Sequence, residues 1–231
     1  MSFFKEKIRE EISYDDDNRI REKKHILNGK LESEYISYYD NGEIMARLNF
    51  HNGQRNGEAS SYYKGGRIRE KGAFANDKLD GEYISYYETG QIREIENYRN
   101  GKLDGKYTLY FSTGQIKETE NFRDGMFNGE YRCYYKSGRL KEQGFFVDDK
   151  RDGEYIAYSV SGKIRERATY KKGKLVGEFL SFDVDDIDYR EDDQDSEEYD
   201  FDNDGKSTEK GKEIDDLLKK MMSFEKERKE E

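Results

Sequence analysis

Residues 80–94 read DGEYISYYETGQIRE, and residues 152–166 read DGEYIAYSVSGKIRE, 72 positions later. The spacing is three times a shorter period of 24 residues. One glycine column with that period comprises Gly57, Gly81, Gly105, Gly129, Gly153 and Gly177, with Ser33 in the position before it. A second column comprises Gly42, Gly66, Gly90, Gly114, Gly138 and Gly162. The chain is therefore a tandem repeat of 24-residue units without insertions.

A third column at the same spacing comprises Gly29, Gly53, Asp77, Gly101, Gly125, Asp149 and Gly173. Between the columns, each unit holds two short runs rich in Tyr, Ile and Phe, which predicts one β-hairpin per repeat. Pairs such as Asn28-Gly29, Asn41-Gly42 and Asn100-Gly101 are typical of hairpin turns because they accept positive φ. We predict an all-β fold, an elongated single-layer antiparallel sheet of stacked hairpins, followed by a C-terminal α-helix.

The period also sets the expected boundaries. Read backward, the register begins near residue 9, which gives an array over residues 9–182 with seven repeats and a closing strand. Residues 1–8 are expected to cap the first edge, because an exposed sheet edge invites pairing with other chains. Residues 183–210 are expected to form an acidic linker, and residues 211–228 an amphipathic helix.

The composition is polar, with 32% hydrophobic and 41% charged residues, yet aromatic residues make up 14% of the chain. Tyrosine can bury its ring and keep its hydroxyl hydrated, so a thin structure without a deep core is feasible. Cys133 is the only cysteine, which excludes an internal disulfide and fits a reducing compartment. The first residues contain no apolar signal segment, and no stretch approaches the length of a membrane helix. We expect a cytoplasmic protein.

The pattern G-E-Y-x-x-Y-Y-x-x-G-x-I, best seen in residues 81–104 and 105–128, resembles the MORN repeat variant. The resemblance extends over residues 9–182. It implies a relation to the YwqK-like proteins grouped as antitoxins of bacterial toxin–antitoxin systems. It is equally compatible with a protein-binding or a membrane-associated scaffold, because repeats of this kind also occur in both classes of protein. Ser33, Asp77 and Asp149 depart from the glycine pattern, and the acidic extension is not part of the motif.

Two adjacent tyrosine columns follow the period. The first column, our candidate for binding a partner, comprises Tyr38, Tyr62, Tyr86, Tyr110, Tyr134 and Tyr158. The second comprises Tyr39, Tyr63, Tyr87, Phe111 and Tyr135 and ends at Ser159. Neighbouring residues of a strand point to opposite faces, so one column should line each face. Either both columns pack between repeats, or one forms an exposed aromatic row; the alternation does not decide which column faces outward.

Two charged rows are also adjacent. The basic row comprises Arg69, Arg93, Lys117, Lys141 and Arg165, and the acidic row comprises Glu70, Glu94, Glu118, Glu142 and Glu166. Strand alternation predicts that the rows lie on opposite faces. They are either solvated charges or, with the tyrosines, a surface for single-stranded nucleic acid. The net charge of residues 1–182 is only +2, which argues against nucleic acid as the partner.

The sequence offers little for catalysis. His25 and His51 are the only histidines, and neither lies in a known nucleophile or metal motif. Cys133 occupies a position that holds Ser or Leu in other repeats. No phosphate-binding loop or dinucleotide fingerprint is present. We therefore predict a protein that is not an enzyme and has no cofactor.

Residues 183–204 hold 13 acidic residues and one basic residue. Asp200, Asp202 and Asp204 begin like a calcium-binding loop, but the twelfth position is Gly211 instead of glutamate, so we assign no metal. The segment is either a disordered linker or a surface for a basic partner, steered by its charge. The acids considered for such contacts are Asp192, Asp193 and Asp195.

The apolar residues of segment 211–228 recur with helical spacing. The candidate contact residues are Leu217, Leu218, Met221 and Met222. Such a helix either caps the last edge of the array or binds a groove of a partner.

These observations predict a non-catalytic, protein-binding repeat scaffold. Its most specific version is an antitoxin or immunity-type protein that neutralises a partner toxin, possibly with a basic surface. The alternative is a structural or membrane-associated scaffold, although the acidic tail would be repelled by anionic lipid. Single-stranded nucleic acid is the least favoured partner, and the oligomeric state stays open.

Overall fold

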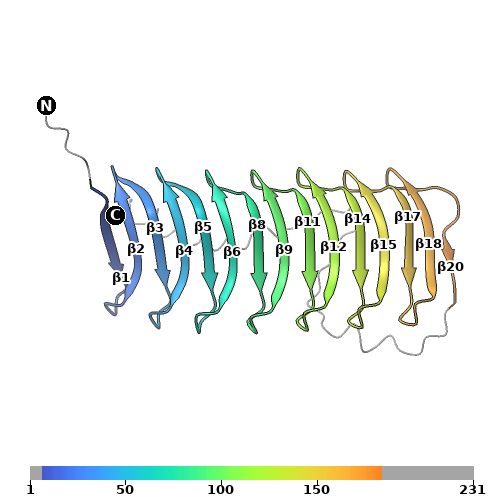
Figure 1. The fold of residues 1–231 in the computed structure, drawn as a ribbon, viewed down its shortest axis with the longest axis horizontal. Helices are drawn as coiled ribbons and strands as arrows, with labels where there is room; N and C mark the ends of the chain where they lie inside the picture. The colour runs from blue at the N-terminus through green and yellow to red at the C-terminus, as the bar shows by residue number, and fades with distance from the viewer. Residues whose placement is uncertain (1–6, 184–231) are drawn as a thin grey trace. The chain divides into compact units, whose positions relative to one another are not determined.

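The computed structural model describes residues 7–183 as one antiparallel sheet of 20 strands (Figure 1). No helix occurs among these residues, so none of them forms a helix that could cross a membrane. The all-β prediction is confirmed. The predicted C-terminal helix over 211–228, the linker after residue 183 and most of the predicted cap over 1–8 lie outside the described residues.

The strands follow the 24-residue period from Arg9 to Ser181. They are β1 (Arg9–Tyr14), β2 (Ile20–Leu27), β3 (Lys30–Tyr38), β4 (Ile44–His51), β5 (Gln54–Tyr62), β6 (Ile68–Ala75), β7 (Lys78–Leu79), β8 (Gly81–Tyr86), β9 (Ile92–Arg99), β10 (Lys102–Leu103), β11 (Gly105–Tyr110), β12 (Ile116–Arg123), β13 (Met126–Phe127), β14 (Gly129–Tyr134), β15 (Leu140–Val147), β16 (Lys150–Arg151), β17 (Gly153–Tyr158), β18 (Ile164–Lys171), β19 (Lys174–Leu175) and β20 (Leu180–Ser181).

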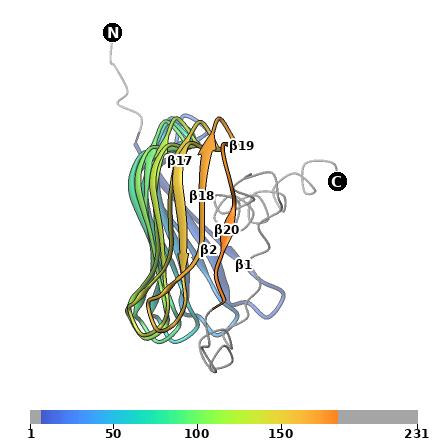
Figure 2. The ribbon, with the colours of Figure 1, turned by 90° about the vertical axis from the view of Figure 1, so that its right-hand side faces the viewer.

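Strands are neighbours in the sheet in the order of the chain. β8 pairs with β9, β9 pairs with β10 and β11, and β11 pairs with β12, all antiparallel. Five strands contain only two residues, pair with the strand before them, and are followed by the next strand: β7, β10, β13, β16 and β19. Figure 2 shows the hairpins stacked behind one another as a single curved layer. The predicted stack of hairpins is confirmed.

One edge of the sheet is made of two-residue turns, which we call the turn edge. Asn100 (φ 51°) and Gly101 (φ 80°) connect Arg99 to its partner Lys102. Positive φ at both central residues is the requirement of a type I′ turn, whose twist matches that of the strands. Asp77 and Asp149 take the glycine position at φ 66° and 63°, so the two departures from the glycine column keep the turn.

The opposite edge is made of five-residue loops, which we call the loop edge. The amide of Tyr87 donates to the carbonyl of Gln91, and the amide of Gly90 donates to the carbonyl of Tyr87, both at 2.8 Å. Asn41-Gly42 lies in a loop of this kind instead of a two-residue turn. Only Gly42 has positive φ there, and Asn41 accepts a hydrogen bond from the amide of Glu43 at 3.1 Å.

Positive φ recurs in the column that begins with Ser33, which itself has φ 69°, and glycine supplies it in the later repeats. Gly129 has φ 137°, and a Cβ atom there would lie 2.9 Å from Cβ of Asn121 on the paired strand. The side-chain amide of Asn121 donates to the carbonyl of Glu130 at 3.1 Å, which holds the two strands close. The glycine therefore permits both the backbone conformation and the approach of the asparagine.

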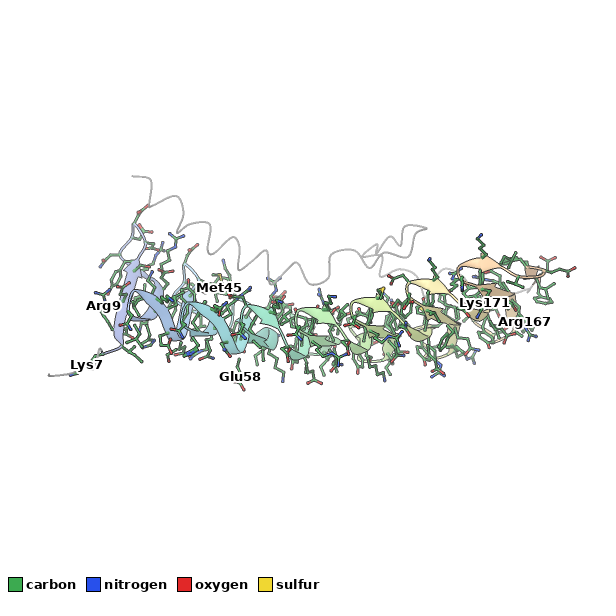
Figure 3. All side chains as sticks on the ribbon, turned by 90° about the horizontal axis from the view of Figure 1, so that it is seen from above. Lys7, Arg9, Met45, Glu58, Arg167 and Lys171 are labelled. Carbon is green, nitrogen blue, oxygen red and sulfur yellow. The ribbon has the colours of Figure 1, made fainter. Side chains whose placement is uncertain are left out.

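Side chains stand on both faces of the layer, as Figure 3 shows. The face that carries Glu94, Tyr107 and Phe122 is the more buried, and we call it the carboxylate face. Its core includes Tyr107, Leu109 and Phe122, packed against Leu103 and Phe127. The rings of Tyr107 and Phe122 meet edge to face at 6.3 Å. The opposite face carries the first tyrosine column, and we call it the Tyr86 face.

Candidate functional site

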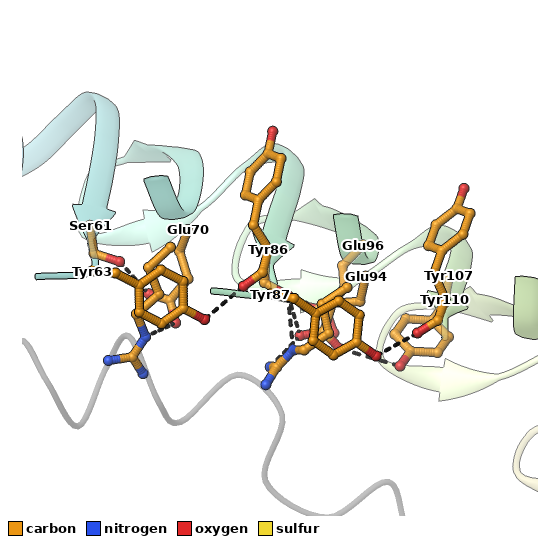
Figure 4. A network of polar contacts seen from close by, with 12 residues as sticks. Ser61, Tyr63, Glu70, Tyr86, Tyr87, Glu94, Glu96, Tyr107 and Tyr110 are labelled. Atoms are coloured by element: carbon orange, nitrogen blue, oxygen red, sulfur yellow. Dashed lines mark hydrogen bonds and ion pairs between the residues drawn. The ribbon is translucent and has the colours of Figure 1, made fainter. Parts of the chain in front are cut away.

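The first tyrosine column lies on the Tyr86 face. Figure 4 shows Tyr86 and Tyr110 pointing away from Tyr87 and Glu94. All six members are half-buried: Tyr38, Tyr62, Tyr86, Tyr110, Tyr134 and Tyr158. Each pairs in the sheet with the aliphatic residue that begins the returning strand, as Tyr110 does with Ile116. The aliphatic partners include Ile68, Ile116 and Ile164, which are 38–39% exposed. The face therefore presents a repeating aromatic and aliphatic row to solvent.

The second tyrosine column joins each repeat to the next. The hydroxyl of Tyr63 donates to the backbone carbonyl of Tyr86 at 2.7 Å, and the hydroxyl of Tyr87 donates to that of Tyr110 at 2.7 Å. Tyr39 and Tyr135 make the same bond to Tyr62 and Tyr158, at 2.5 and 2.8 Å. Burial raises the pKa of Tyr39 and Tyr63. The tyrosines of the second column thus hold the backbone of four members of the first, whereas Phe111 has no hydroxyl to donate to Tyr134.

The acidic row lies in the carboxylate face, where three of its members are buried and Glu142 and Glu166 are half-buried. Glu70, Glu94 and Glu118 are 2–6% exposed. Oε1 of Glu94 accepts hydrogen bonds from Ser85 at 2.9 Å and Arg93 at 2.7 Å, and its Oε2 accepts one from Tyr107 at 3.3 Å. Each donor lowers the cost of burying the carboxylate. Because Tyr107 belongs to the following repeat, the network also joins neighbouring repeats.

The prediction that the basic and acidic rows lie on opposite faces is wrong. Ser85 pairs with Glu94, whereas the next residue, Tyr86, pairs with Ile92. Arg93 is therefore an extra residue, and the β-bulge interrupts the alternation of side chains. As a result, Arg93 bonds to Glu94, its neighbour in sequence, and also donates to Ser85 at 3.2 Å.

One carboxylate of the row is less well satisfied. Oε1 of Glu118 is buried and has no hydrogen-bond partner among residues 7–183. In its repeat, Leu109 replaces the serine and Lys117 replaces the arginine that serve Glu94. Tyr131, the corresponding phenol of the next repeat, donates instead to Glu142 at 2.8 Å. The difference between repeats follows directly from these three positions.

Sequence analysis missed a third tyrosine column, although its signal is the tyrosine of the G-E-Y pattern. It comprises Tyr35, Tyr83, Tyr107, Tyr131 and Tyr155, on the carboxylate face. Burial, followed by the charge of nearby glutamates, raises the pKa of Tyr83, Tyr107, Tyr131 and Tyr155. These phenols are protonated near neutral pH, and Tyr107, Tyr131 and Tyr155 donate hydrogen bonds to glutamates.

Cys133 lies opposite both Glu118 and Glu142 in the sheet. Burial, followed by these two carboxylates, raises the pKa of its thiol to about 12. The thiol is therefore almost entirely protonated near neutral pH, and the thiolate is the nucleophilic form. Cys133 fits the packing role of the serine or leucine that other repeats carry at this position.

The two histidines contact different residues. Nδ1 of His25 lies 2.9 Å from the carbonyl oxygen of Glu34, and Nδ1 of His51 lies 2.8 Å from Oε1 of Glu32. Within the described part of the chain, no group of three or more His, Cys, Asp and Glu residues is placed to hold a metal ion. The remaining candidates lie outside the described residues: Asp192, Asp193, Asp195, Asp200, Asp202, Asp204, Leu217, Leu218, Met221 and Met222.

Comparison with known families agrees with the repeat. The family model described as the MORN repeat variant matches five segments, residues 31–52, 79–100, 103–124, 127–148 and 151–172. Each segment spans one long strand, its loop and the returning strand. The predicted resemblance to the MORN repeat variant is confirmed in these segments. No curated protein matches the sequence.

Solved structures give only distant likenesses. A GtfA/B complex bound to UDP and GlcNAc is 15% identical, with a TM-score of 0.22, over 47% of this chain and 21% of that one. A Tc holotoxin pore of Photorhabdus luminescens is 10% identical, with a TM-score of 0.21, over 71% of this chain and 11% of that one. A porin-like protein of Bacteroides uniformis is 6% identical, with a TM-score of 0.21, over 73% and 86%. The chain thus spans about a fifth or less of the first two structures.

Proposed function

We propose that the chain is a non-catalytic scaffold that binds a protein partner through the Tyr86 face. The observation that carries this proposal is the row of half-exposed tyrosines. The backbone carbonyls of four of them accept a hydrogen bond from a hydroxyl of the preceding repeat: Tyr62, Tyr86, Tyr110 and Tyr158. Tyrosine offers a large contact area with few torsions to immobilise. A backbone that is already held in place loses less conformational entropy when the face binds a partner.

The most specific form of the proposal is an antitoxin or immunity-type role in the cytoplasm. In this role the Tyr86 face supplies the contact area, and the acidic segment, including Asp192, Asp193 and Asp195, binds a basic surface of the toxin. Support comes from the MORN repeat variant segments and from the 13 acidic residues of 183–204. Because salt screens contacts between exposed charges, the contribution of the acidic segment to the affinity for the toxin should fall steeply as the salt concentration rises.

Affinity purification tests the scaffold role. The tagged wild-type chain is compared with a triple variant, Tyr62→Ala, Tyr86→Ala and Tyr110→Ala, and with a control that carries three exposed changes on the same strands, Glu58→Gln, Glu82→Gln and Lys106→Gln. A specific partner co-purifies with the wild type and the control, and is depleted at least about tenfold by the triple variant. Equal recovery from all three would exclude the Tyr86 face.

Co-expression tests the antitoxin role separately. A partner that arrests growth alone, and does not arrest it beside the wild-type chain, is a neutralised toxin. A partner that does not arrest growth would be consistent with the scaffold role and would exclude the antitoxin role. Binding that is undiminished after deletion of 183–231 would exclude the acidic segment from the contact.

The alternative is a structural or membrane-associated scaffold, for which exposed Ile68, Ile116 and Ile164 give some support. Sedimentation with liposomes of neutral and anionic lipid distinguishes the two. Strong sedimentation that the triple tyrosine variant abolishes would favour the membrane over a protein partner.

A further inference from the structure

Three asparagine–glycine pairs form two-residue turns at the turn edge: Asn28-Gly29, Asn52-Gly53 and Asn100-Gly101. The asparagines have φ angles of 54°, 51° and 51°, and the glycines have φ angles of 75°, 84° and 80°. All three pairs are exposed to solvent. The three turns therefore share the same chemistry and the same backbone, and they differ only in what surrounds them.

The internal turns are bonded to the preceding repeat. The backbone amide of Asn100 donates to Oδ2 of Asp80 at 2.9 Å, and that of Gly101 donates to the carbonyl of Leu79 at 2.7 Å. The turn at residues 52–53 makes the same two bonds, both at 2.8 Å. Each of these turns is therefore held by two hydrogen bonds from outside its own hairpin.

The first turn, Asn28-Gly29, has no equivalent repeat before it. By the same spacings its two acceptors would belong to Ile8 and Lys7. The side chain of Ile8 has no acceptor, and Lys7 precedes β1, which begins at Arg9. Among residues 7–183, none accepts a backbone hydrogen bond from the amide of Gly29. The first turn thus lacks the contacts that hold the other two.

We propose that Asn28 is the preferred site of spontaneous deamidation in the native chain. In this reaction the backbone nitrogen of Gly29 loses its proton and attacks Cγ of Asn28. An N–Cγ bond forms, the Cγ–Nδ2 bond breaks, and ammonia leaves with that proton. One water then opens the succinimide ring to give aspartate or isoaspartate, so one water is consumed for each ammonia released.

The hydrogen bond that Gly101 donates opposes the same reaction at Asn100. A bonded amide loses its proton less readily, and the turn must open before the nitrogen can reach Cγ. Opening an internal turn breaks two hydrogen bonds to the preceding repeat, whereas opening the turn at residues 28–29 breaks neither. Because local opening becomes rarer as more contacts must break, deamidation should be fastest at Asn28.

The two products should affect the first hairpin differently. Aspartate fits the turn, because Asp124 and Gly125 form it with φ angles of 54° and 85°. Isoaspartate inserts a side-chain carbon into the backbone, which the two-residue turn between Leu27 and Lys30 does not accommodate. Isoaspartate is therefore expected to weaken the pairing of β2 with β3 at the turn edge.

Peptide mapping of the full chain tests the proposal, with electron-transfer fragmentation to separate isoaspartate from aspartate. In mildly alkaline buffer, the native chain should deamidate at Asn28 at least about tenfold faster than at Asn52 and Asn100. In urea the three rates should agree within a few-fold, because only the local sequence then acts. Equal native rates at the three sites, or a slower rate at Asn28, would overturn the proposal.

A pair of variants tests the cause. Asp80→Ala removes the acceptor of the Asn100 amide, so deamidation at Asn100 should become several-fold faster, with no change at Asn28. Glu82→Ala, an exposed change two residues further along the chain, should alter neither rate. An unchanged rate at Asn100 in Asp80→Ala would contradict protection by the preceding repeat. The assay uses the free chain and the turn edge, so its result is independent of the partner proposed for the Tyr86 face.

Discussion

The hydroxyl of Tyr87 donates a 2.7 Å hydrogen bond to the backbone carbonyl of Tyr110, 23 residues further along the chain in the next repeat. The bond joins a residue of the carboxylate face to the strand that displays the next tyrosine of the Tyr86 face. In a repeat protein each unit contacts only its neighbours, so such contacts contribute directly to the coupling between units.

Tyr87→Phe removes this hydroxyl and keeps the ring. We expect the free energy of unfolding to fall by about 1 kcal/mol, the usual net value of one such bond. Tyr86→Phe, the matched change on the opposite face, should cost less than about 0.5 kcal/mol. Urea denaturation followed by circular dichroism measures both; equal losses would show that the Tyr87 hydroxyl does not couple the repeats.

Gly129→Ala tests the start of the long strands. Its φ of 137° and the 2.9 Å approach to Asn121 both oppose a side chain. We expect a loss of about 2–3 kcal/mol. Gly114→Ala, in a loop with φ 90° and no atom within 4 Å of the new Cβ, should cost only about 1 kcal/mol. If Gly114→Ala is the more harmful change in thermal denaturation, the account of the strand start is wrong.

The stability of the array should fall in acid. The backbone amide of Asp124, followed by the guanidinium of Arg99, lowers the pKa of Asp104, and the amide of Asn52 lowers that of Glu32. A lowered pKa in the folded chain means that the unfolded chain takes up protons first, so the stabilisation is present above about pH 4 and is lost as pH falls further.

Asp104→Asn should therefore lower the melting temperature at pH 7, and the difference from the wild type should shrink as pH falls through the lowered pKa of Asp104, below which both lack the charge. Asp16→Asn, an exposed change between β1 and β2, serves as the control and should have little effect at either pH. A difference for Asp104→Asn that grows in acid would contradict this assignment.

The thiol of Cys133 should react slowly with a disulfide reagent. A pKa near 12 leaves far less thiolate at pH 8 than an unfolded cysteine has. We expect the rate in the native chain to be at least about 100-fold below the rate in urea. A native rate within a few-fold of the unfolded rate would mean that the thiol is accessible to the reagent and that its pKa is not raised.

The period and the turns could be predicted from the sequence because each depends on local chemistry. Asn100-Gly101 defines its own type I′ turn, and Asp77 keeps the same backbone conformation without glycine. Asn41-Gly42 looked equivalent in the sequence, but the longer loop around it changes the turn. The two-residue turn needs both central residues at positive φ, and Asn41 is not among them.

The faces could be predicted only in part. Alternation separates Tyr86 from Tyr87, as Figure 4 shows, but it does not say which side is buried. That depends on packing across strands, such as the contact of Tyr107 with Phe122. The bulge at Arg93 has no local signal in the sequence, so the positions of the basic and acidic rows could not be derived by alternation.

The central claim is that the Tyr86 face is the surface that binds a partner, and hydroxyl-radical footprinting with mass spectrometry tests it most directly. In the free chain, Tyr62, Tyr86 and Tyr110 should be oxidised faster than buried Tyr83 and Tyr107, which are 5% and 1% exposed. Adding the co-purified partner should protect the first three. Unchanged oxidation of Tyr62, Tyr86 and Tyr110, with protection at the carboxylate face instead, would contradict the account.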